Sequence, residues 1–451
     1  MGGAYPGKMS KAAIILAAGQ GTRMKSALPK VLHKVAGLPM LGQVIAALRS
    51  AGMDRIVVVT SAAGEAVRAF ALSQGCETAI QEQQLGTGHA AASAKSALGD
   101  FDGTIIIASG DTPLITPQIV SDVLAAKENA GLALAAFVAA DPASYGRVLT
   151  APDGFLDRIV EFKDASEAER AIRLCNAGLY AVDARQFFGW AGALNNNNAQ
   201  GEYYLTDIPL LARAEGVACA LAHVDEISVT GVNSRAELAA AEALMQGRIR
   251  RRLLDAGVGM AAPDTVHFCH DTVVGSDAVI EPYVVFGPGV TVASGATIRA
   301  FSHIEGASVA SGAIVGPYAR LRPGAQIGED AHIGNFVEVK NTQIGKGAKA
   351  NHLSYLGDAT VGAKANIGAG TITCNYDGYT KARTVIGAGA FIGSDTALVA
   401  PVKVGDGAIT AAGSVITEDV DADALAIARG TQMQKRGWAA AFRASKTKDK
   451  K

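Results

Sequence analysis

A glycine-rich segment follows the first apolar run of the chain and could hold phosphate groups. Residues 12–18 are apolar and run directly into Gly19-Gln20-Gly21-Thr22-Arg23, with Lys30 shortly after. Glycines let backbone N–H groups approach phosphate oxygens, while Arg23 and Lys30 can neutralise the negative charge. The glycine spacing fits neither a Rossmann fingerprint nor a Walker loop. Taken alone, such a glycine pair is commonly only a turn.

A carboxylate lies just past a second apolar run. Residues 104–108 are apolar, and Ser109-Gly110-Asp111 follow. At this position Asp111 could hold Mg²⁺ between two phosphates, and Asn233 could supply a second oxygen ligand. A lone Asp-Thr-Pro is more often a turn or a helix cap. On these residues alone both interpretations stay open.

A second group of polar residues lies in the last third of the chain, around His352. An imidazole has the right pKa to take a proton from an attacking amine near neutrality. Basic side chains nearby would suit a sugar phosphate. A histidine by itself is more often a satisfied surface residue, but its surroundings here favour a base. These surroundings are Arg322, Lys340, Tyr355 and Asn366.

The segment that carries this second group repeats with a period of six. Its lead residues are aliphatic or aromatic, beginning Val274, Ile280, Phe286, Val292. Such a period is too short for two helices and too regular for an ordinary sheet, so it predicts a parallel β-helix. Residues about eighteen apart would then stack on successive coils. His352 and Glu338 are fourteen residues apart, which is close to that spacing once the slip of the repeat near Ile344 is allowed for, so we expect a hydrogen bond between them.

The earlier part of the chain alternates apolar runs with helical patterns, which predicts a doubly wound α/β domain over residues 11–235. Residues 1–10 are expected to be a leader or tag. A helical linker is expected over 236–258, with Ser234 and Glu237 forming a capping box. The β-helix would fill 259–451 and end in a flexible tail. Helical patterns in the first domain cover 40–50, 90–97 and 118–129, and apolar runs cover 12–18, 55–59 and 104–108.

Composition limits the classes of partner and the compartment. The 451 residues carry a formal net charge of -1, which argues against nucleic acid or a membrane surface as a main partner. The five cysteines have neither paired metal-ligand spacing nor the pattern of a disulfide framework, so a reducing cytoplasm is expected. No signal peptide or apolar run of membrane-spanning length is visible.

Two sets of motifs carry a resemblance to known families. The string L-A-A-G-Q-G-T-R-M at 16–24, with Leu28-Pro29-Lys30 and Gly110-Asp111-Thr112-Pro113-Leu114, resembles the signature of sugar-1-phosphate nucleotidyltransferases. The hexad strings N-F-V-E-V-K, N-H-L-S-Y-L-G-D and N-I-G-A-G-T narrow the match. Together they resemble the bacterial family that joins an N-acetylglucosamine-1-phosphate uridyltransferase to a glucosamine-1-phosphate N-acetyltransferase, over residues 12–438.

This resemblance implies a Rossmann-like nucleotidyltransferase domain, a left-handed β-helix, and a homotrimer. Its substrates would be glucosamine-1-phosphate, N-acetylglucosamine-1-phosphate, UTP and acetyl-CoA, with Mg²⁺ as cofactor. Arg23 and Lys30 would serve the phosphates, and His352 would be the proton acceptor. The positions implied for UTP and its product are Leu16, Ala17, Ala18, Gly19, Lys30, Gln81, Gly86, Thr87, Ser109, Gly110, Asp111, Gly146, Glu161, Asn176 and Asn233, with Asp111 and Asn233 also on the metal. Those implied for the sugar phosphate of acetyl transfer are Arg322, Lys340, Tyr355 and Asn366, and those for acetyl-CoA are Ala369, Asn375, Tyr376, Ser394, Ala412 and Arg429.

Two departures and two alternatives accompany this interpretation. Gln20 stands where relatives often have a basic residue, and the segment after Arg429 differs from the expected pattern. One alternative is a nucleotidyltransferase whose β-helix only assembles or regulates it, which the polar group around His352 argues against. The other is a scaffold without catalysis, which would be expected to lose Arg23, Lys30 or Asp111; all three are present.

Overall fold

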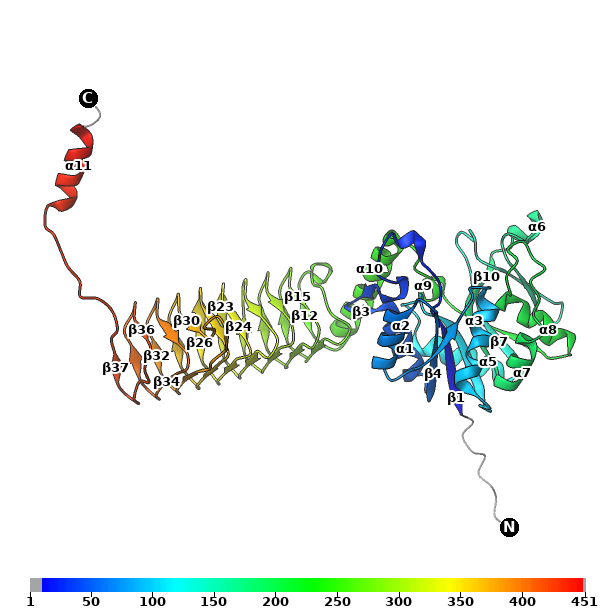
Figure 1. Cartoon of the computed structure of the whole chain (residues 1–451), viewed down its shortest axis with the longest axis horizontal. Coiled ribbons are helices and arrows are strands. Elements are labelled where there is room, and N and C mark those ends of the chain that lie inside the picture. The colour runs from blue at the N-terminus through cyan, green and yellow to red at the C-terminus, as the bar shows by residue number, and fades with distance from the viewer. Residues whose placement is uncertain (1–9, 449–451) are drawn as a thin grey trace, which may run out of the picture. The chain divides into compact units, whose positions relative to one another are not determined.

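The computed structural model describes residues 10–448, and these divide into two compact units that meet at Gly247 and Arg248. Figure 1 shows an α/β unit followed by a long β-helix. Residues 1–9 of the expected leader lie outside the described residues. Ser10, its last residue, accepts a backbone hydrogen bond from Thr104. No helix among the described residues is long and apolar enough to cross a lipid bilayer.

The α/β unit is built on a sheet that has nine strands among the described residues, with the main order β11-β7-β10-β6-β1-β4-β5. β1 pairs in parallel with β4 and β6, while β10 runs antiparallel to β6 and β7. The doubly wound prediction is confirmed, because separate apolar cores pack on the two faces of this sheet. The strands are β1 (Lys11–Leu16), β4 (Arg55–Ser61), β5 (Glu77–Gln81), β6 (Thr104–Ser109), β7 (Leu132–Val138), β8 (Arg147–Thr150), β9 (Leu156–Val160), β10 (Leu174–Asp183) and β11 (Cys219–His223).

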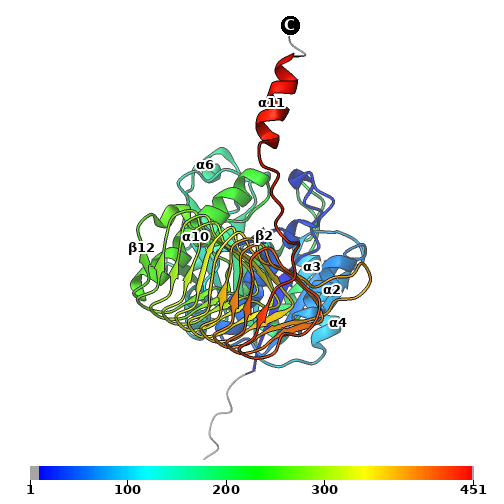
Figure 2. The same ribbon diagram turned by 90° about the vertical axis from the view of Figure 1, so that its left-hand side faces the viewer.

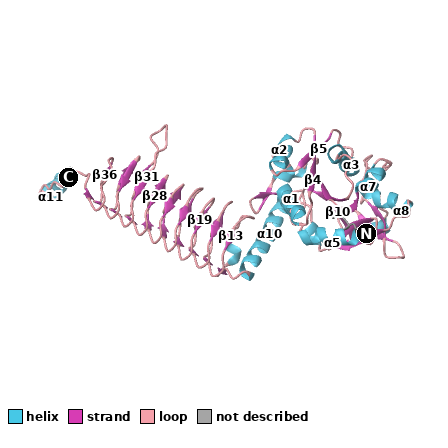
Figure 3. Cartoon of the chain, turned by 90° about the horizontal axis from the view of Figure 1, so that it is seen from below, coloured by secondary structure: helices cyan, strands magenta, loops and turns pink. Residues whose placement is uncertain are grey.

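Helices and short turns surround this sheet (Figure 3). The first expected helix matches α1, whereas the expected helix at 90–97 is divided into α3 and α4 at Ala94. A small hairpin of β2 (Lys34–Val35) and β3 (Leu38–Pro39) precedes α1. The helices are α1 (Met40–Ser50), α2 (Glu65–Ser73), α3 (Thr87–Ser93), α4 (Lys95–Leu98), α5 (Pro117–Glu128), α6 (Glu167–Arg170), α7 (Ala184–Ala191), α8 (Ile208–Ala214) and α9 (Glu226–Val229), with the 3-10 turns η1 (Thr22–Met24), η2 (Lys30–Leu32) and η3 (Leu205–Asp207). A further 3-10 turn, η4 (Pro263–Thr265), belongs to the second unit.

The region where we expected a helical linker forms one helix, α10 (Arg235–Asp255). Its expected capping box is present: the backbone N–H of Glu237 donates to Ser234 Oγ at 3.2 Å, and the N–H of Ser234 donates to Glu237 Oε2 at 3.1 Å. Near its end, Arg250 Nε donates to the carbonyl of Val266 at 3.0 Å. That contact gives Arg250 an intramolecular role.

The second unit is a left-handed parallel β-helix (Figure 2): the hexads predicted the parallel β-helix, and the family resemblance implied its handedness. Its coils visit three faces in turn, and each lead residue of the repeat is buried, for example Ile280, Ile304 and Leu321. Stacking of coils therefore buries what one coil could not. Among the described residues, face 1 has ten strands and faces 2 and 3 have eight each.

The bounds of these strands follow. Face 1 consists of β12 (Gly259–Met260), β14 (Val279–Ile280), β17 (Thr297–Ile298), β20 (Ile314–Val315), β23 (His332–Asn335), β26 (Lys349–His352), β29 (Asn366–Ile367), β32 (Phe391–Ile392), β35 (Ile409–Thr410) and β37 (Leu425–Ala426). Face 2 consists of β15 (Val285–Phe286), β18 (His303–Ile304), β21 (Arg320–Leu321), β24 (Glu338–Lys340), β27 (Tyr355–Gly357), β30 (Ile372–Cys374), β33 (Ala397–Val399) and β36 (Val415–Ile416). Face 3 consists of β13 (Val273–Val274), β16 (Thr291–Val292), β19 (Ser308–Val309), β22 (Gln326–Ile327), β25 (Gln343–Ile344), β28 (Ala359–Val361), β31 (Thr384–Ile386) and β34 (Val402–Val404).

One loop interrupts the regular β-helix, and one helix follows it. The segment between β30 and β31 projects from the coils as a loop (Figure 3). The chain ends in α11 (Trp438–Lys448), so residues 446–448 are helical where we expected a flexible tail. Alanines at 439–441 and a lysine-rich end favour a helix there. Residues 449–451 of the expected tail lie outside the described part of the chain.

Candidate active sites

A cavity of 260 Å³ opens at the carboxyl ends of β1, β5 and β6. This is where ligands bind in a doubly wound sheet. Four further residues line it that the sequence interpretation did not assign to the nucleotide: Val31, Gln84, Ala90 and Glu202. The expected nucleotide residues that line it are Leu16, Ala17, Ala18, Gly19, Lys30, Gln81, Gly86, Thr87, Ser109 and Asp111. Gly110 lies beside them, with its N–H bonded to the carbonyl of Leu16 at 2.9 Å.

Lys30 joins the two residues expected to hold a metal. Its ammonium forms an ion pair with Asp111 and donates a hydrogen bond to Asn233 Oδ1 at 3.0 Å. Ser109 Oγ donates to the other oxygen of Asp111 at 2.6 Å. Gly21 allows this arrangement, because its φ is +61° and a Cβ there would lie 2.5 Å from Lys30 Cβ. A carboxylate and an amide oxygen thus already converge on one cation, and this donor set fits Mg²⁺.

Gln81 is held by its neighbours at one end of the cavity. Its Nε2 donates to the carbonyl of Gly86 at 3.1 Å and lies 3.1 Å from His89 Nδ1. The segment around Tyr203 packs against the same turn, and a Cβ on Gly86 would lie 2.6 Å from the Tyr203 carbonyl oxygen. His89 therefore contacts a residue that is expected to bind the nucleotide.

Gln84 is a binding candidate that sequence reasoning missed. Its Nε2 donates to the carbonyl of Ala18 at 2.6 Å, and its Oε1 accepts from Gln20 Nε2 at 3.0 Å. Gln20, noted as a departure in the glycine loop, is thereby connected to the cavity wall. The signal that could have revealed Gln84 is its position three residues after Gln81, in the loop that follows the carboxyl end of β5.

Three of the residues expected to bind UTP or its product, Gly146, Glu161 and Asn176, form a neighbouring group. The N–H of Asn176 donates to the carbonyl of Gly146 at 2.9 Å, and a Cβ on Gly146 would lie 3.7 Å from Glu161 Oε1. Thr206 Oγ1 donates to Glu161 Oε1 at 3.0 Å. Burial raises the pKa of Glu161, and nearby carboxylates, Asp164 first among them, raise it further. Arg23 is exposed on η1.

In the β-helix, one corner aligns several of the expected residues. His352 ends its face 1 strand, and the corresponding positions on the following coils are Ala369, Ser394 and Ala412. Backbone hydrogen bonds fix this alignment: the N–H of Asp395 donates to the Ala369 carbonyl at 2.7 Å, and that of Gly413 to the Ser394 carbonyl at 2.8 Å. We call this line of five residues the polar column: Asn335, His352, Ala369, Ser394 and Ala412. The three residues that follow His352 in this column have small side chains.

The expected hydrogen bond between His352 and Glu338 is wrong. His352 Nδ1 instead lies 2.9 Å from Oδ1 of Asn335, a residue seventeen positions earlier. Glu338 lies on face 2, where its register partner is Tyr355. A separation of fourteen therefore spans different faces, because a full coil here takes seventeen residues.

Glu338 has a different partner on face 2. Arg322 Nη1 donates to Glu338 Oε1 at 2.8 Å, and this bond raises the pKa of Arg322. Lys340 and Tyr355 lie on the same face, at β24 and β27. Three of the four residues expected to hold the sugar phosphate are therefore on or beside face 2 of one chain.

Asp358 organises the loop that follows β30. Its carboxylate accepts hydrogen bonds from Asn341 Nδ2, at 2.6 Å, and from Asn375 Nδ2. Burial alone would raise the pKa of Asp358, but these bonds and the charges of Lys340 and Lys381 hold it below its ordinary value. Tyr376, the next residue of the loop, is exposed.

Two further residues expected to bind substrates, Asn366 and Arg429, do not lie on face 2. Asn366 begins its face 1 strand in register with Lys349, three residues before the position that aligns with His352. It therefore lies at the opposite edge of face 1 from His352. Arg429 lies beyond the last coil, and its Nη1 donates to the carbonyl of Ala412 at 2.6 Å, next to the polar column.

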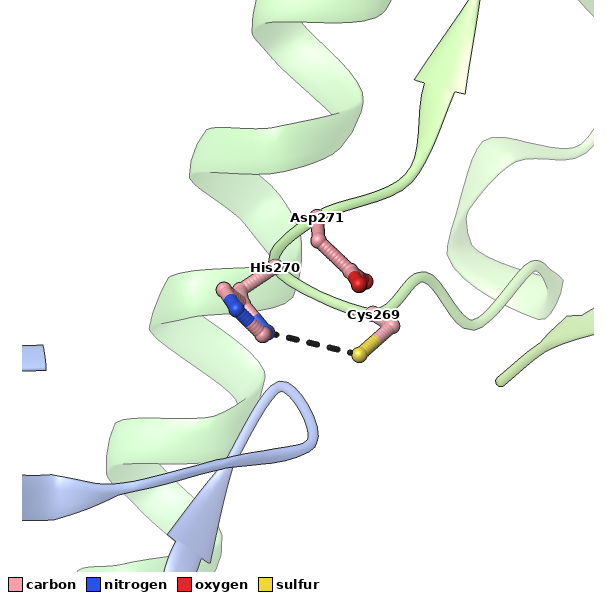
Figure 4. A group of neighbouring side chains, drawn as sticks. All are labelled: Cys269, His270 and Asp271. Carbon is pink, nitrogen blue, oxygen red and sulfur yellow. Dashed lines mark hydrogen bonds between the residues drawn. The ribbon is translucent and has the colours of Figure 1, made fainter. Parts of the chain in front are cut away.

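Cys269, His270 and Asp271 form a further cluster of possible metal ligands, drawn in Figure 4. The Cys269 sulfur lies 3.4 Å from His270 Nδ1, and Asp271 Oδ2 accepts from the Gly289 N–H at 2.8 Å. Burial raises the pKa of Cys269 to about 11, so its thiol keeps its proton. These contacts fasten the first coil to the next, and we assign the cluster to the fold.

Comparison with known proteins finds a matching family for each of the two units. Residues 13–180 match the family of MobA-like NTP transferase domains, and residues 271–306, 306–341 and 383–418 match the bacterial transferase hexapeptide repeat. The chain is thus a nucleotidyltransferase-type domain joined to a hexapeptide-repeat transferase domain.

Its relatives define the family. The chain is 51% identical over 446 residues to the bifunctional protein GlmU of Paramagnetospirillum magneticum, covering 97% of this chain and 98% of that protein. It is 54% identical to GlmU of Sphingopyxis alaskensis (97% and 98% covered) and 56% identical to GlmU of Maricaulis maris (97% and 97% covered). The chain belongs to the GlmU family of bifunctional proteins.

Proposed function

We propose that the chain makes UDP-N-acetylglucosamine by two successive transfers, one in each unit. The β-helix moves an acetyl group from acetyl-CoA to the amine of glucosamine-1-phosphate. The α/β unit then moves the uridylyl group of UTP to N-acetylglucosamine-1-phosphate and releases pyrophosphate. The observation that supports this most is that each unit has its own group of functional side chains. In the α/β unit Lys30 contacts Asp111 and Asn233, and in the β-helix His352 contacts Asn335 in the polar column.

In uridylyl transfer, the sugar-phosphate oxygen attacks the α-phosphorus of UTP, and the bond from that phosphorus to pyrophosphate breaks. No protein nucleophile is needed, so positioning and charge neutralisation do the catalytic work. Asp111 and Asn233 would hold Mg²⁺, which when bound neutralises charge between the phosphates. Lys30 and Arg23 serve the phosphate oxygens, and Glu161, Gly146 and Asn176 bind the sugar.

In acetyl transfer, the amine of glucosamine-1-phosphate attacks the thioester carbonyl. The new bond is C–N, the bond from carbon to sulfur breaks, and coenzyme A leaves as its thiol or thiolate. His352 accepts the proton that the amine loses. Arg322, Lys340 and Tyr355 hold the sugar phosphate, while the small residues of the polar column leave space for acetyl-CoA.

We also propose that the chain acts as a homotrimer. Four aromatic side chains stack on the corner between faces 1 and 2, with ring centroids 4.9 to 5.3 Å apart. Each is between 47% and 56% exposed, an apolar strip that a second copy could cover. Asn366 lies at a different edge from His352, so a neighbouring copy is needed for both to reach one substrate. We call the four residues the aromatic column: Tyr283, Phe301, Tyr318 and Phe336.

Two coupled assays test this function. Free thiol should be released from acetyl-CoA when glucosamine-1-phosphate is the acceptor, and pyrophosphate should follow once UTP and Mg²⁺ are added. Pyrophosphate release without any thiol release would favour a nucleotidyltransferase with a purely structural β-helix. All five cysteines are free thiols, in keeping with the reducing cytoplasm that we propose as its location.

A further inference from the structure

Asn335 and His352 occupy the same position on two successive coils. β23 and β26 pair in parallel with Asn335 directly opposite His352. The coils approach closely here, since a Cβ on Gly334 would lie 2.0 Å from the carbonyl oxygen of Asn351. The N–H of Leu353 also donates to the Asn335 carbonyl at 3.1 Å. The backbone therefore holds the two side chains beside each other.

The side-chain contact determines which ring nitrogen of His352 carries hydrogen. Oδ1 of Asn335 can only accept a hydrogen bond, so Nδ1 of His352 must donate across the 2.9 Å separation. In a neutral imidazole, the lone pair then lies on Nε2. On the other side, the corresponding residue is Ala369, whose side chain cannot compete for the ring.

The histidine backbone is fixed as well. Ser354 Oγ donates to the carbonyl of His352 at 2.8 Å. Leu353, between them, has a left-handed backbone with φ 49°, as does Phe336 on the coil before, with φ 55°. The corner thus repeats one backbone shape on both coils, and the ring has little freedom except rotation about its own side-chain bonds.

We propose that Asn335 is a positioning residue for acetyl transfer, which holds His352 in the tautomer whose Nε2 can accept the proton of the attacking amine. The proposal rests on the function proposed above for His352. Asn335 itself receives no proton. It orients the ring and makes the wrong tautomer costly, because that tautomer would leave Nδ1 facing another acceptor.

The charged groups around this ring are basic. His332 precedes Asn335 on β23, and its pKa is lowered first by burial and then by the charges of Arg299, Lys349 and His352. A carboxylate placed at position 335 would therefore be the nearest negative charge to the ring.

Two variants test the proposal. Asn335→Ala should lower kcat for acetyl transfer about 10- to 100-fold, less than the loss of the base itself, and leave KM for glucosamine-1-phosphate within about twofold. Asn335→Asp keeps an acceptor at the same place, so it should restore most of kcat. Its negative charge favours the protonated imidazole, so the acid limb of the pH profile should move upward by about one pH unit.

The controls separate orientation from folding. Gln343→Ala removes an exposed amide from face 3 of the same β-helix and should leave acetyl transfer unchanged. Uridylyl transfer by the same samples should equal that of the parent chain. If Asn335→Ala lowers thermal stability, Asn335→Asp carries the test by itself, through its kcat and its pH profile.

The outcomes distinguish this inference from the function on which it rests. If His352→Ala retains acetyl transfer, the base assignment and the inference both fail. If His352→Ala is inactive while both Asn335 variants keep the parental kcat and pH profile, only the positioning role is wrong. A loss in Asn335→Asp as deep as in Asn335→Ala, with no shift of the pH profile, would also overturn it.

Discussion

Lys30 forms an ion pair with Asp111, and its ammonium also donates a hydrogen bond to Asn233. A positive charge therefore occupies the space between the two oxygen donors that we assign to Mg²⁺. Metal binding must displace this ammonium, since two cations held by the same carboxylate repel each other.

Lys30→Met should consequently bind a divalent cation more tightly when no nucleotide is present. We expect the Kd for Mn²⁺, measured by titration calorimetry or electron paramagnetic resonance, to fall about tenfold, while uridylyl transfer slows because a phosphate contact is lost. The matched control is Lys34→Met, at an exposed lysine nearby. An unchanged Kd in Lys30→Met would show that the ammonium does not guard the metal position.

Glu161→Gln should stabilise the α/β unit at neutral pH. The pKa of Glu161 is raised above its ordinary value of 4.5, first by burial and then by neighbouring carboxylates. A raised pKa in the folded state favours folding below 4.5 and costs stability as the pH rises through the folded value. The gain in unfolding free energy should therefore be present at pH 7 and vanish near pH 4.

Denaturant unfolding at several pH values measures this difference, with exposed Glu167→Gln as the control. The same Glu161→Gln variant should bind N-acetylglucosamine-1-phosphate more weakly, as KM for the sugar will show. A stability gain that is constant across this pH range would mean that ionisation of Glu161 is not its cause.

Gly334→Ala should destabilise the β-helix. The added Cβ would lie 2.0 Å from the carbonyl oxygen of Asn351, so the two coils must separate. Overpacking of this kind costs about 1–3 kcal/mol, and acetyl transfer should fall because Asn335 and His352 move apart.

Thermal unfolding checks this, and Gly247→Ala is a control of opposite sign. Gly247 lies within α10, and a Cβ added there would meet no neighbouring atom within 4 Å, so alanine should stabilise the helix by roughly 0.5–1 kcal/mol. An unfolding temperature for Gly334→Ala equal to that of the parent chain would contradict the tight stacking at this coil.

Tyr318→Arg should dissociate the homotrimer. Tyr318 lies in the middle of the aromatic column, stacked on Phe301 and Phe336. A charge there would be desolvated on assembly. Sedimentation should give a smaller species with little acetyl transfer, whereas Val273→Arg, at an exposed position of face 3, should leave the assembly intact. If the Tyr318→Arg variant remains a trimer, the aromatic column is not part of the subunit interface.

The architecture could be predicted from the sequence because the patterns that indicate it involve residues close together in the chain. Each hexad places one apolar residue inward, so the lead residues from Val274 onward predict both the period and the buried side of every strand. α10 was predicted for the same reason, since Ser234 and Glu237 are three residues apart. The division of α3 from α4 was missed, because the alanines there are compatible with one continuous helix.

Long-range contacts were less predictable. The partner of His352 depends on whether a coil takes fourteen, seventeen or eighteen residues, and one difference in turn length moves a side chain to another face. Asn335, not Glu338, therefore meets the ring. The contact of Lys30 with Asp111 spans 81 positions and depends on the whole sheet, so each residue was proposed separately while their contact was not.

The central claim is that two independent sites act in sequence, and a mixing experiment tests it most directly. Asp111→Ala should lose uridylyl transfer and keep acetyl transfer, and His352→Ala should do the reverse. When the two purified variants are mixed with glucosamine-1-phosphate, acetyl-CoA, UTP and Mg²⁺, UDP-N-acetylglucosamine should form although neither variant makes it alone. If either substitution abolishes both activities in a folded protein, or if the mixture yields no product, the account of two separate sites is wrong.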